Sequence, residues 1–389
     1  MSVLLSSNSS EYDRPSCGRT DCAHSSDDGI DRSTKSLTVG LVNNMPDGAL
    51  QSTERQFRIL LESASRGLNV RLRLYALPGV PRGEAAARHI GRHYASTEQL
   101  GATRLDGLIV TGREPLTPSL CDEPYWNSFT KLLGWAQANT TSTVWSCLAA
   151  HAAVLHMDGI GRVRSDHKHC GVLECARISE HLLTADIPSC FAIPHSRWNG
   201  LVEEELMERG YQVLTRTAGA GVDTFIRQTR SLFVFFQGHP EYESNTLLLE
   251  YRRDVARFFR GETKTYPTLP QSYFAPETML MLRALEEEAQ AFPREEFLAK
   301  VMEILDTVSI ENTWHRTAAG IYRNWLQYLC SEKRLHPENH QAEAAANDGN
   351  HPGAQHPPDD ARVTPAVLCG GYPAPRTVST AARSTPTIL

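Results

Sequence analysis

Short apolar runs alternate with helical periodicity along the first part of the chain. Runs with the composition of buried strands occupy residues 37–42, 70–75, 107–112 and 143–147. Between them, apolar residues at helical spacing predict a helix that begins near Ser52 and Thr53 and further helices over about 82–94 and 123–139. This alternation predicts an α/β fold: a mostly parallel, doubly wound sheet with helices on both faces.

The second half of the chain has a different pattern. A polar region around His169, which we expect to be irregular, precedes three runs that predict successive antiparallel strands, over 211–215, 222–226 and 231–236. Helical spacing then returns in segments at about 245–260, 277–307 and 314–329, with a break near Pro293 in the second. Residues 1–35 and 332–389 lack periodic apolar positions. We therefore expect a disordered leader and a disordered tail around an ordered domain of residues 36–331.

Composition narrows the class of protein. The chain is 41% hydrophobic and 22% charged, and its net charge of −6 argues against nucleic acid or an anionic membrane as a partner. We find neither an apolar run of the roughly 20 residues that a membrane helix needs nor a secretory signal. Nine irregularly spaced cysteines do not suggest disulfides, so we expect a cytoplasmic protein. Cys17, Cys22 and His24 are only a weak metal signal, and we predict no metal site.

Residues 143–154 join the end of a buried strand to the start of an alanine-rich helix, and Cys147 lies at the junction. The positive end of a helix stabilises a thiolate, and its backbone N–H groups can receive an oxyanion. In parallel sheets, ligands bind beyond the carboxyl ends of the strands, where Cys147 falls. The alternative is a small core cysteine. Because the other candidate cysteines lie in loops or irregular stretches, Cys147 is the predicted nucleophile.

A catalytic cysteine needs a base, and the base needs an orienting group. His239 follows the 231–236 run, and Glu241 comes two residues later, where an extended chain points both side chains the same way. The pattern suggests Cys–His–Glu acyl transfer, with the separation in space left open by the sequence. His151, one helical turn beyond Cys147, is an alternative base, but it points along the helix side, so we favour His239.

Several motifs, in the same order, resemble those of the homoserine O-acyltransferases of the MetA type. They are residues 43–46 with 53–57, 107–112 with 125–126, 194–197, 238–242 with 252–254, and 314 with 324–326. The likeness covers about residues 37–330. It implies the class I glutamine amidotransferase-like fold, with 277–307 as a helical insertion.

The resemblance implies a ping-pong mechanism in methionine biosynthesis. Cys147 would carry the acyl group as a thioester, with His239 as general base and then acid, and Glu241 would orient the imidazole. Backbone N–H groups of Leu148 and Arg113 are the expected oxyanion donors. The family usually has Trp-Gly or Trp-Ala after the nucleophile, whereas this chain has Leu148 and Ala149.

The resemblance also implies the substrates and the residues that bind them. Lys168 and Ser196 match family active-site positions, and Arg253 matches the arginine that holds the amino acid's carboxylate. The implied partners are succinyl-CoA or acetyl-CoA and L-homoserine, with no cofactor beyond the acyl-CoA co-substrate, in a homodimer.

The acyl group is the open point. In the family, a glutamate after the Thr-Gly pair marks acetyl transfer and a glycine marks succinyl transfer, but this chain has Leu116 there. Leucine removes the repulsion of a succinyl carboxylate while it fills space, and Arg113 can pair with that carboxylate if it points inward. We therefore favour succinyl over acetyl. Serine as acceptor, a glutamine amidotransferase-like hydrolase and an inactive binding homologue are the alternatives.

Overall fold

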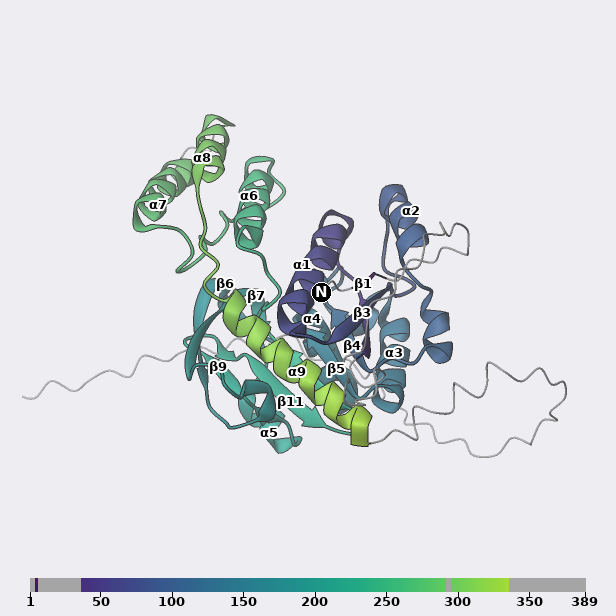
Figure 1. The fold of residues 1–389 in the computed structure, drawn as a ribbon. Coiled ribbons are helices and arrows are strands. Elements are labelled where there is room, and N and C mark those ends of the chain that lie inside the picture. The colour runs from purple at the N-terminus through teal and green to yellow at the C-terminus, as the bar shows by residue number, and fades with distance from the viewer. Residues whose placement is uncertain (1–3, 6–35, 292–294, 336–389) are drawn as a thin grey trace, which may run out of the picture. The chain divides into compact units, whose positions relative to one another are not determined.

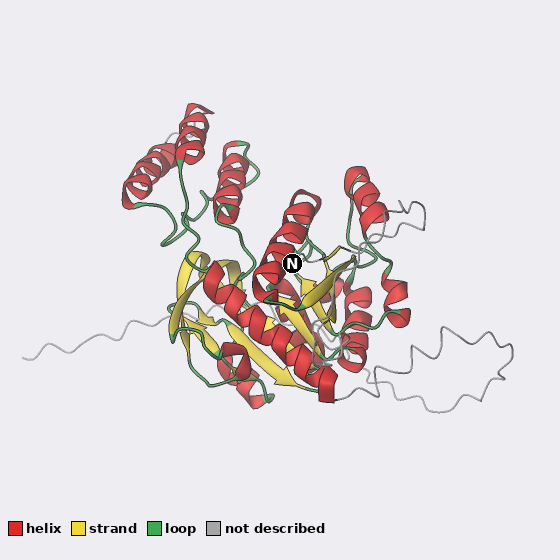
Figure 2. Ribbon diagram, in the orientation of Figure 1, coloured by secondary structure: helices red, strands yellow, loops and turns green. Residues whose placement is uncertain are grey.

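The computed structural model describes residues 4–5, 36–291 and 295–335 (Figure 1). Cys17, Cys22 and His24, the break expected near Pro293, and the tail beyond residue 335 lie outside these residues. The described part has a mostly parallel sheet with helices on both faces, and a second, smaller sheet beside it (Figure 2). The predicted α/β class is confirmed.

Eight strands form the main sheet, in the order β1-β3-β2-β4-β5-β12-β11-β8. Their bounds are β1 Leu4–Leu5, β2 Ser36–Val42, β3 Asn69–Tyr75, β4 Gly107–Thr111, β5 Ser142–Ser146, β8 Gln212–Val213, β11 Thr224–Gln228 and β12 Leu232–Phe236. All neighbours from β1 to β12 are parallel, whereas β11 runs antiparallel to β12 and to β8. The prediction of successive antiparallel strands is therefore right for β11 and β12, but β12 also pairs in parallel with β5.

Helices cover both faces of this sheet. Their bounds are α1 Asp47–Ser65, α2 Glu84–His93, α3 Trp126–Asn139, α4 Leu148–Asp158, α5 Glu203–Glu208 and α9 His315–Leu335, with short 3₁₀ turns η2 Thr97–Ala102, η3 Leu120–Asp122 and η4 Leu182–Thr184. α1 and α9 lie along one face, while α3 and α4 cover the other (Figure 1). Successive strand residues point to opposite faces, so Val144 joins the core under α9 and Trp145 joins the core under α3.

Helix α1 begins earlier than the sequence predicts. Instead of starting near Ser52, it begins at Asp47, directly after Pro46 in an extended conformation. An acidic residue in the first turn is favourable because it faces the positive end of the helix dipole. The carboxylate of Asp47 also accepts a bond from the Gly83 N–H at 2.7 Å. This tertiary contact fixes the first residue of α1, and the hydrophobic periodicity of the sequence cannot reveal it.

The polar region around His169 is not irregular, which corrects the prediction. It forms β6, the long central strand of a four-stranded antiparallel sheet ordered β10-β9-β6-β7. The bounds are β6 Val163–Arg177, β7 Cys190–Gly200, β9 Thr215–Thr217 and β10 Gly221–Val222. The β6–β7 register shifts between Arg164 and His169, and this irregularity interrupts the alternation that would mark a strand.

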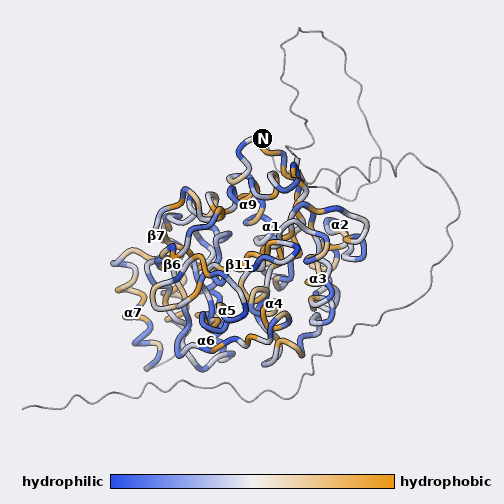
Figure 3. The backbone as a smooth tube through the Cα atoms, turned by 90° about the horizontal axis from the view of Figure 1, so that it is seen from below, coloured by the Kyte–Doolittle hydropathy of each residue, from blue (hydrophilic) through white to orange (hydrophobic). Residues whose placement is uncertain are grey.

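A third group of helices packs on the second sheet: α6 Thr246–Phe259, α7 Pro276–Ala291 and α8 Glu295–Thr307. The helices predicted over 245–260 and 277–307 are confirmed, and the helix predicted over 314–329 extends to Leu335 as α9. Figure 3 shows how composition follows position: α4, against the main sheet, is largely apolar, whereas α5 is largely hydrophilic. None of the described helices is long and apolar enough to cross a membrane.

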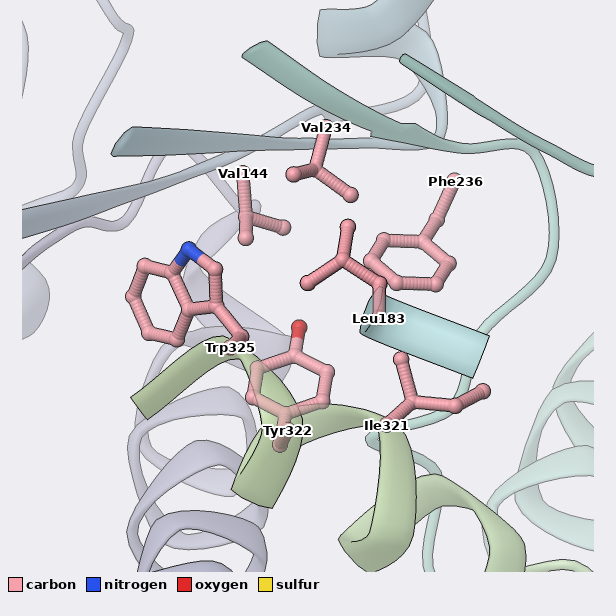
Figure 4. Close-up of a pocket in the computed structure, with 7 residues that line it drawn as sticks. All are labelled: Val144, Leu183, Val234, Phe236, Ile321, Tyr322 and Trp325. Carbon is pink, nitrogen blue, oxygen red and sulfur yellow. The ribbon is translucent and has the colours of Figure 1, made fainter. Parts of the chain in front are cut away.

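A small apolar cavity lies between α9 and the main sheet (Figure 4). Its lining comprises Val144, Leu183, Val234, Phe236, Ile321, Tyr322 and Trp325. The indole N–H of Trp325 donates to Ser142 Oγ at 2.9 Å, and this hydroxyl donates to the Leu232 carbonyl at 2.6 Å. These bonds lock α9 onto the starts of β5 and β12. The cavity is therefore a packing feature of this interface rather than a substrate site.

Candidate active site

Cys147 occupies the strained turn between β5 and α4. Its backbone has φ 52° and ψ −114°, a region that residues other than glycine rarely adopt and that costs on the order of 1–3 kcal/mol. Its N–H donates to the Phe236 carbonyl at 2.7 Å, so the end of β12 holds the turn in place. The side chain is half-buried, directly before the first turn of α4. This is the geometry of a nucleophile elbow.

His239 and Glu241 lie at the same edge of the sheet. β5 and β12 are parallel neighbours with Ser146 opposite Phe236, so the chain leaves both strands side by side. His239 Nδ1 lies 2.9 Å from Glu241 Oε1, and the imidazole lies close enough to Cys147 to interact with it electrostatically. The ring stacks on Tyr242, with centroids 4.2 Å apart. The structure thus brings the three predicted catalytic residues together.

The electrostatics of His239 favour an ion pair with the thiolate. Burial alone lowers the pKa of this imidazole, but the negative charges of Cys147 and Glu241 outweigh burial and hold the pKa well above its usual range. An imidazolium beside Cys147 stabilises the thiolate, which is the reactive form of cysteine.

His151, the alternative base, is occupied elsewhere. It is buried, and its Nε2 lies 3.0 Å from Gln237 Oε1. Burial, together with the positive charges of Arg197 and Arg162, lowers its pKa to about 3. His151 is therefore neutral at physiological pH and bonded to an amide rather than to Cys147.

Two of the competing cysteines are unsuited to nucleophilic chemistry. Cys170 and Cys175 are buried on β6. Burial raises the pKa of Cys170 to about 12 and also raises that of Cys175. Cys190 is exposed at the start of β7 and lies apart from the catalytic edge.

The two predicted oxyanion donors, Leu148 and Arg113, lie on segments that approach each other closely at Gly112. A Cβ placed on Gly112 would lie 2.7 Å from the backbone N of Leu148, so only glycine allows this approach. The Gly112 N–H is already used, because it donates to the Ser146 carbonyl at 3.1 Å. Within the described residues, the N–H groups of Leu148 and Arg113 have no protein acceptor. They remain available to a developing oxyanion.

A buried polar network behind the site holds the backbone at Gly238 and His239. Asp223 Oδ1 accepts from the Gly238 N–H at 3.0 Å, and Oδ2 accepts from the hydroxyls of Thr215 and Thr224, both at 2.9 Å. The His239 N–H donates to the Pro194 carbonyl at 2.8 Å.

His195 and Arg197 complete this network. Arg197 Nε donates to His195 Nδ1 at 3.3 Å, and burial, then the charge of Arg197, keeps the pKa of His195 well below its usual range. Cys175, His195 and Asp223 are the one group of three metal-type ligands that meets among the described residues. Because both oxygens of Asp223 already accept protein hydrogen bonds and Arg197 stands beside them, the group fits a positioning network better than a metal.

The three predicted substrate-binding residues meet along one side of α6. Ser196 Oγ donates to Glu250 Oε2 at 2.6 Å. Lys168 Nζ lies 3.4 Å from Asp254 Oδ2, and Arg253 Nε donates to Asp254 Oδ1 at 2.8 Å. The Arg253 side chain is half exposed. The site therefore offers cations and a carboxylate, Glu250, for an amino acid's two charged groups.

Leu116 lies in the loop between β4 and α3, and its side chain is 51% exposed. Its backbone N–H donates to Glu123 Oε1 at 2.6 Å, and this oxygen also accepts from the Thr117 N–H at 3.0 Å. Glu123 is buried, and its second oxygen has no partner among the described residues.

Sequence reasoning missed several residues of this region. Glu123, Arg162 and Asp223 belong to none of the quoted motifs, and no periodicity marks a buried charge. Glu250 lies two residues before the motif 252–254, and Tyr242, whose hydroxyl donates to Glu250 Oε1 at 2.6 Å, lies inside the motif 238–242. The signal that the sequence offered was position: Tyr242 lies inside a family motif and Glu250 lies beside one, and neither had been given a role.

A cysteine on a strand-to-helix elbow, with a histidine and a carboxylate at the same edge of an α/β sheet, defines the class of enzymes that act through a covalent cysteine intermediate. The family model of homoserine O-succinyltransferase matches residues 22–335. The chain belongs to this family and is an acyltransferase, as the resemblance of its motifs predicts.

Curated relatives support the same assignment. The chain is 45% identical over 299 residues to the homoserine O-succinyltransferase of Methylorubrum extorquens, which covers 77% of this chain and 89% of the relative. It is 47% identical over 296 residues to that of Rhodopseudomonas palustris, covering 76% and 89%.

Among solved structures, a glutamine amidotransferase from Methylobacillus flagellatus matches with a TM-score of 0.43 at 12% identity, over 76% of this chain and 95% of that one. Another, from Thermotoga maritima, matches with a TM-score of 0.39 at 9% identity, over 75% and 97%. The α/β fold class stated above rests on the strand order itself.

Proposed function

We propose that this protein transfers a succinyl group from succinyl-CoA to the hydroxyl of L-homoserine through a thioester on Cys147. The observation that carries the proposal is the Cys147–His239–Glu241 arrangement in a chain of the homoserine O-succinyltransferase family. The relatives bear the name of this reaction, which belongs to methionine biosynthesis.

In the first half-reaction, the Cys147 thiolate attacks the thioester carbonyl of the acyl-CoA. A bond forms between Sγ and the acyl carbon, and the Leu148 and Arg113 N–H groups bind the oxyanion. The bond from the acyl carbon to the CoA sulfur then breaks, and the CoA thiolate takes the proton of the His239 imidazolium. Cys147 is left as a thioester, and His239 is left neutral.

In the second half-reaction, neutral His239 removes the proton of the homoserine hydroxyl, whose oxygen attacks the thioester. The tetrahedral intermediate expels the Cys147 thiolate, and the imidazolium and thiolate pair is restored. Glu241 orients the ring through Nδ1 and stabilises its charged form. The cycle needs no cofactor beyond the acyl-CoA co-substrate.

We assign the amino acid to the α6 side of the site. Arg253 binds the homoserine carboxylate, for which a forked, permanently charged guanidinium is suited. Lys168 and Ser196 line the same place, linked to α6 through Asp254 and Glu250. In a glutamine-hydrolysing enzyme with the same triad, these cations would have no evident task. Serine remains the alternative acceptor.

Succinyl is the preferred acyl group for two reasons. The relatives are named as succinyltransferases, and Arg113 carries a buried Nη1 that has no partner among the described residues. Acetyl transfer is the alternative.

Intact-protein mass spectrometry after incubation with succinyl-CoA or acetyl-CoA, without acceptor, tests the proposal. We expect one added succinyl group, which is absent from Cys147→Ala and present in Cys190→Ala, a control that removes an exposed cysteine. An acetyl adduct alone would reassign the donor. No adduct with either donor, together with ammonia release from glutamine, would replace the proposal with the hydrolase alternative.

We further propose that the enzyme is a cytoplasmic homodimer, as the family resemblance implies. Light scattering of the purified protein measures the oligomeric state directly.

A further inference from the structure

A charged cluster lies near Cys147, and the mechanism above leaves most of it unused. It comprises Arg113 and Glu123 in the loop between β4 and α3, Tyr125 at the end of that loop, and Arg162 before β6. These charged side chains lie near one another, because the buried phenol of Tyr125 interacts electrostatically with all three, Glu123, Arg113 and Arg162. Segments distant in sequence thus bring two guanidinium groups and one carboxylate to the same place.

Within the part of the chain that the structure describes, one hydrogen bond anchors Arg162. Its Nη2 donates to the Pro118 carbonyl at 3.3 Å, which places the guanidinium against the loop between β4 and α3. The side chain is half-buried and lies within electrostatic range of Glu123, Tyr125 and the Cys147 sulfur. No ion pair shorter than 4 Å joins it to an acidic group among the described residues. It is a partly desolvated cation near the nucleophile without a close counter-ion.

Arg113 also has a guanidinium N–H donor without an acceptor among the described residues. Its Nε donates to the Glu114 carbonyl at 3.2 Å, but its Nη1 is buried and has no partner among the described residues. Glu123 does not supply the missing acceptor, because its Oε1 is taken by the loop N–H groups and its Oε2 has no partner. Buried donors without acceptors are costly, and such a group of donors favours an anion that brings its own oxygens.

We propose that Arg162, with Arg113 beside it, binds the free carboxylate of the succinyl group while that group is attached to Cys147. The inference rests on the proposed function, since it concerns the acyl group of the same reaction. With ordinary bond lengths, the free carboxylate of an extended succinyl thioester lies roughly 5 Å from the sulfur. Arg162 interacts electrostatically with Cys147, and it is hydrogen-bonded to Pro118 in the loop whose Gly112 lies against Leu148, the residue after the nucleophile. A guanidinium matches a carboxylate with two parallel N–H donors.

This assignment also explains how Leu116 and Glu123 bear on the selection of the acyl group. The side chain of Leu116 is exposed. Glu123 holds the Leu116 and Thr117 backbone, so the loop that carries Arg113 keeps one shape. Selection for a succinyl group then comes from an attraction to Arg162, and not from the size of residue 116 alone.

The test compares two acyl donors that differ in one group. Succinyl-CoA carries the free carboxylate, and butyryl-CoA has the same four carbons without it. We expect Arg162→Gln to slow thioester formation on Cys147 from succinyl-CoA roughly 10- to 100-fold, the cost of losing a hydrogen bond to a charged group. The rate with butyryl-CoA should change less than about twofold. Arg162→Lys, which keeps the charge and loses the fork, should fall between the two.

Arg164→Gln is the matched control. Arg164 has the same charge and lies on β6 two residues away, but its guanidinium stacks over the exposed Trp198 ring, 4.3 Å from the centroid. It should leave the succinyl-to-butyryl ratio unchanged. A thermal unfolding midpoint near that of the unmodified protein shows that each variant is folded.

Two outcomes would overturn the inference. If Arg162→Gln and Arg162→Lys slow both donors equally, the arginine acts on the CoA part or on the loop. If neither variant changes either rate, the carboxylate binds elsewhere. In both cases the unmodified protein still forms the succinyl thioester, so failure here is distinct from failure of the proposed function, in which no thioester forms at all.

Discussion

Cys147 adopts a backbone conformation that costs energy, and the surrounding contacts maintain it. The bond from its N–H to the Phe236 carbonyl and the close approach of Gly112 to Leu148 hold the turn from two neighbouring strands. The strain places the thiol at the start of α4, where the helix dipole and free N–H groups act on it. Neighbouring residues thus stabilise the unfavourable backbone conformation of Cys147, and this conformation places its thiol where it can act as a nucleophile.

Two histidines near Cys147 have opposite electrostatic environments. His239 faces the charges of Cys147 and Glu241, which raise its pKa, whereas burial and nearby arginines lower that of His151. Residue type and spacing make both plausible bases. Their hydrogen-bond partners distinguish them. The carboxylate of Glu241 favours the protonated form of His239, whereas the neutral amide of Gln237 leaves His151 neutral.

His151 gives a prediction about stability and pH. Its folded-state pKa of about 3 lies below the unfolded value of about 6.5, so between these values the unfolded chain binds more protons. This group therefore makes stability fall as pH drops from about 6.5 towards 3, by about 1.4 kcal/mol per pH unit. In His151→Gln, which keeps a donor for Gln237, the pH slope of the urea-unfolding free energy should be shallower by that amount. An unchanged slope would contradict the neutral state of His151.

At the scale of elements, the end of β12 is positioned by the second sheet. Pro194, on β7, accepts the His239 N–H, and Asp223, between β10 and β11, accepts the Gly238 N–H. A Cβ on Gly238 would lie 2.7 Å from Ile193 and 2.8 Å from Asp223 Oδ1. The catalytic base is therefore fixed by strands that carry no catalytic residue.

Asp223→Asn tests this positioning role. The amide keeps the shape, but one of its groups can no longer accept the bonds that Asp223 now receives, so we expect a loss of about 1–3 kcal/mol in unfolding free energy. The turnover number kcat should fall roughly 10-fold, while the KM for homoserine changes little, because misplacing His239 affects chemistry more than binding.

A matched control is Asp306→Asn, which breaks an exposed ion pair with Arg252 and should leave both quantities nearly unchanged. If Asp223→Asn loses stability and keeps kcat, Asp223 has only a structural role.

At the scale of the whole described molecule, α9 closes the sheet over the ends of chain segments far apart in sequence. Trp325 bonds to Ser142 at the start of β5, and Lys333 donates to the Ser36 carbonyl at 2.9 Å and pairs with Asp106 at 3.1 Å. Leu326 and Leu329 are buried in the core below it. The last helix is therefore part of the domain that holds the active site.

Truncations test this division. A chain that ends after Leu335 should keep the kcat and unfolding midpoint of the full chain, because the core and site residues named above lie within residues 36–335. A chain that ends at Trp314 should fail to fold, since it loses the burial of α9. A large loss of activity in the first truncation would show that later residues contribute to the site.

The sequence by itself determined the elements with clear periodicity and their order. It predicts the parallel strands, the helix α6 and the strand-to-helix junction at Cys147, because local composition and spacing decide these features. It also predicts the triad through motifs, although not its geometry.

Only the tertiary structure decided what depends on contacts between distant segments. The parallel register of β5 and β12 sets Cys147 beside His239, and the pairing of β6 with β7 makes a strand of a segment whose local pattern is irregular. The roles of Arg162, Glu123 and Asp223 arise in the same way. The role of a buried charged side chain depends on the atoms that surround it, and these atoms belong to distant parts of the chain.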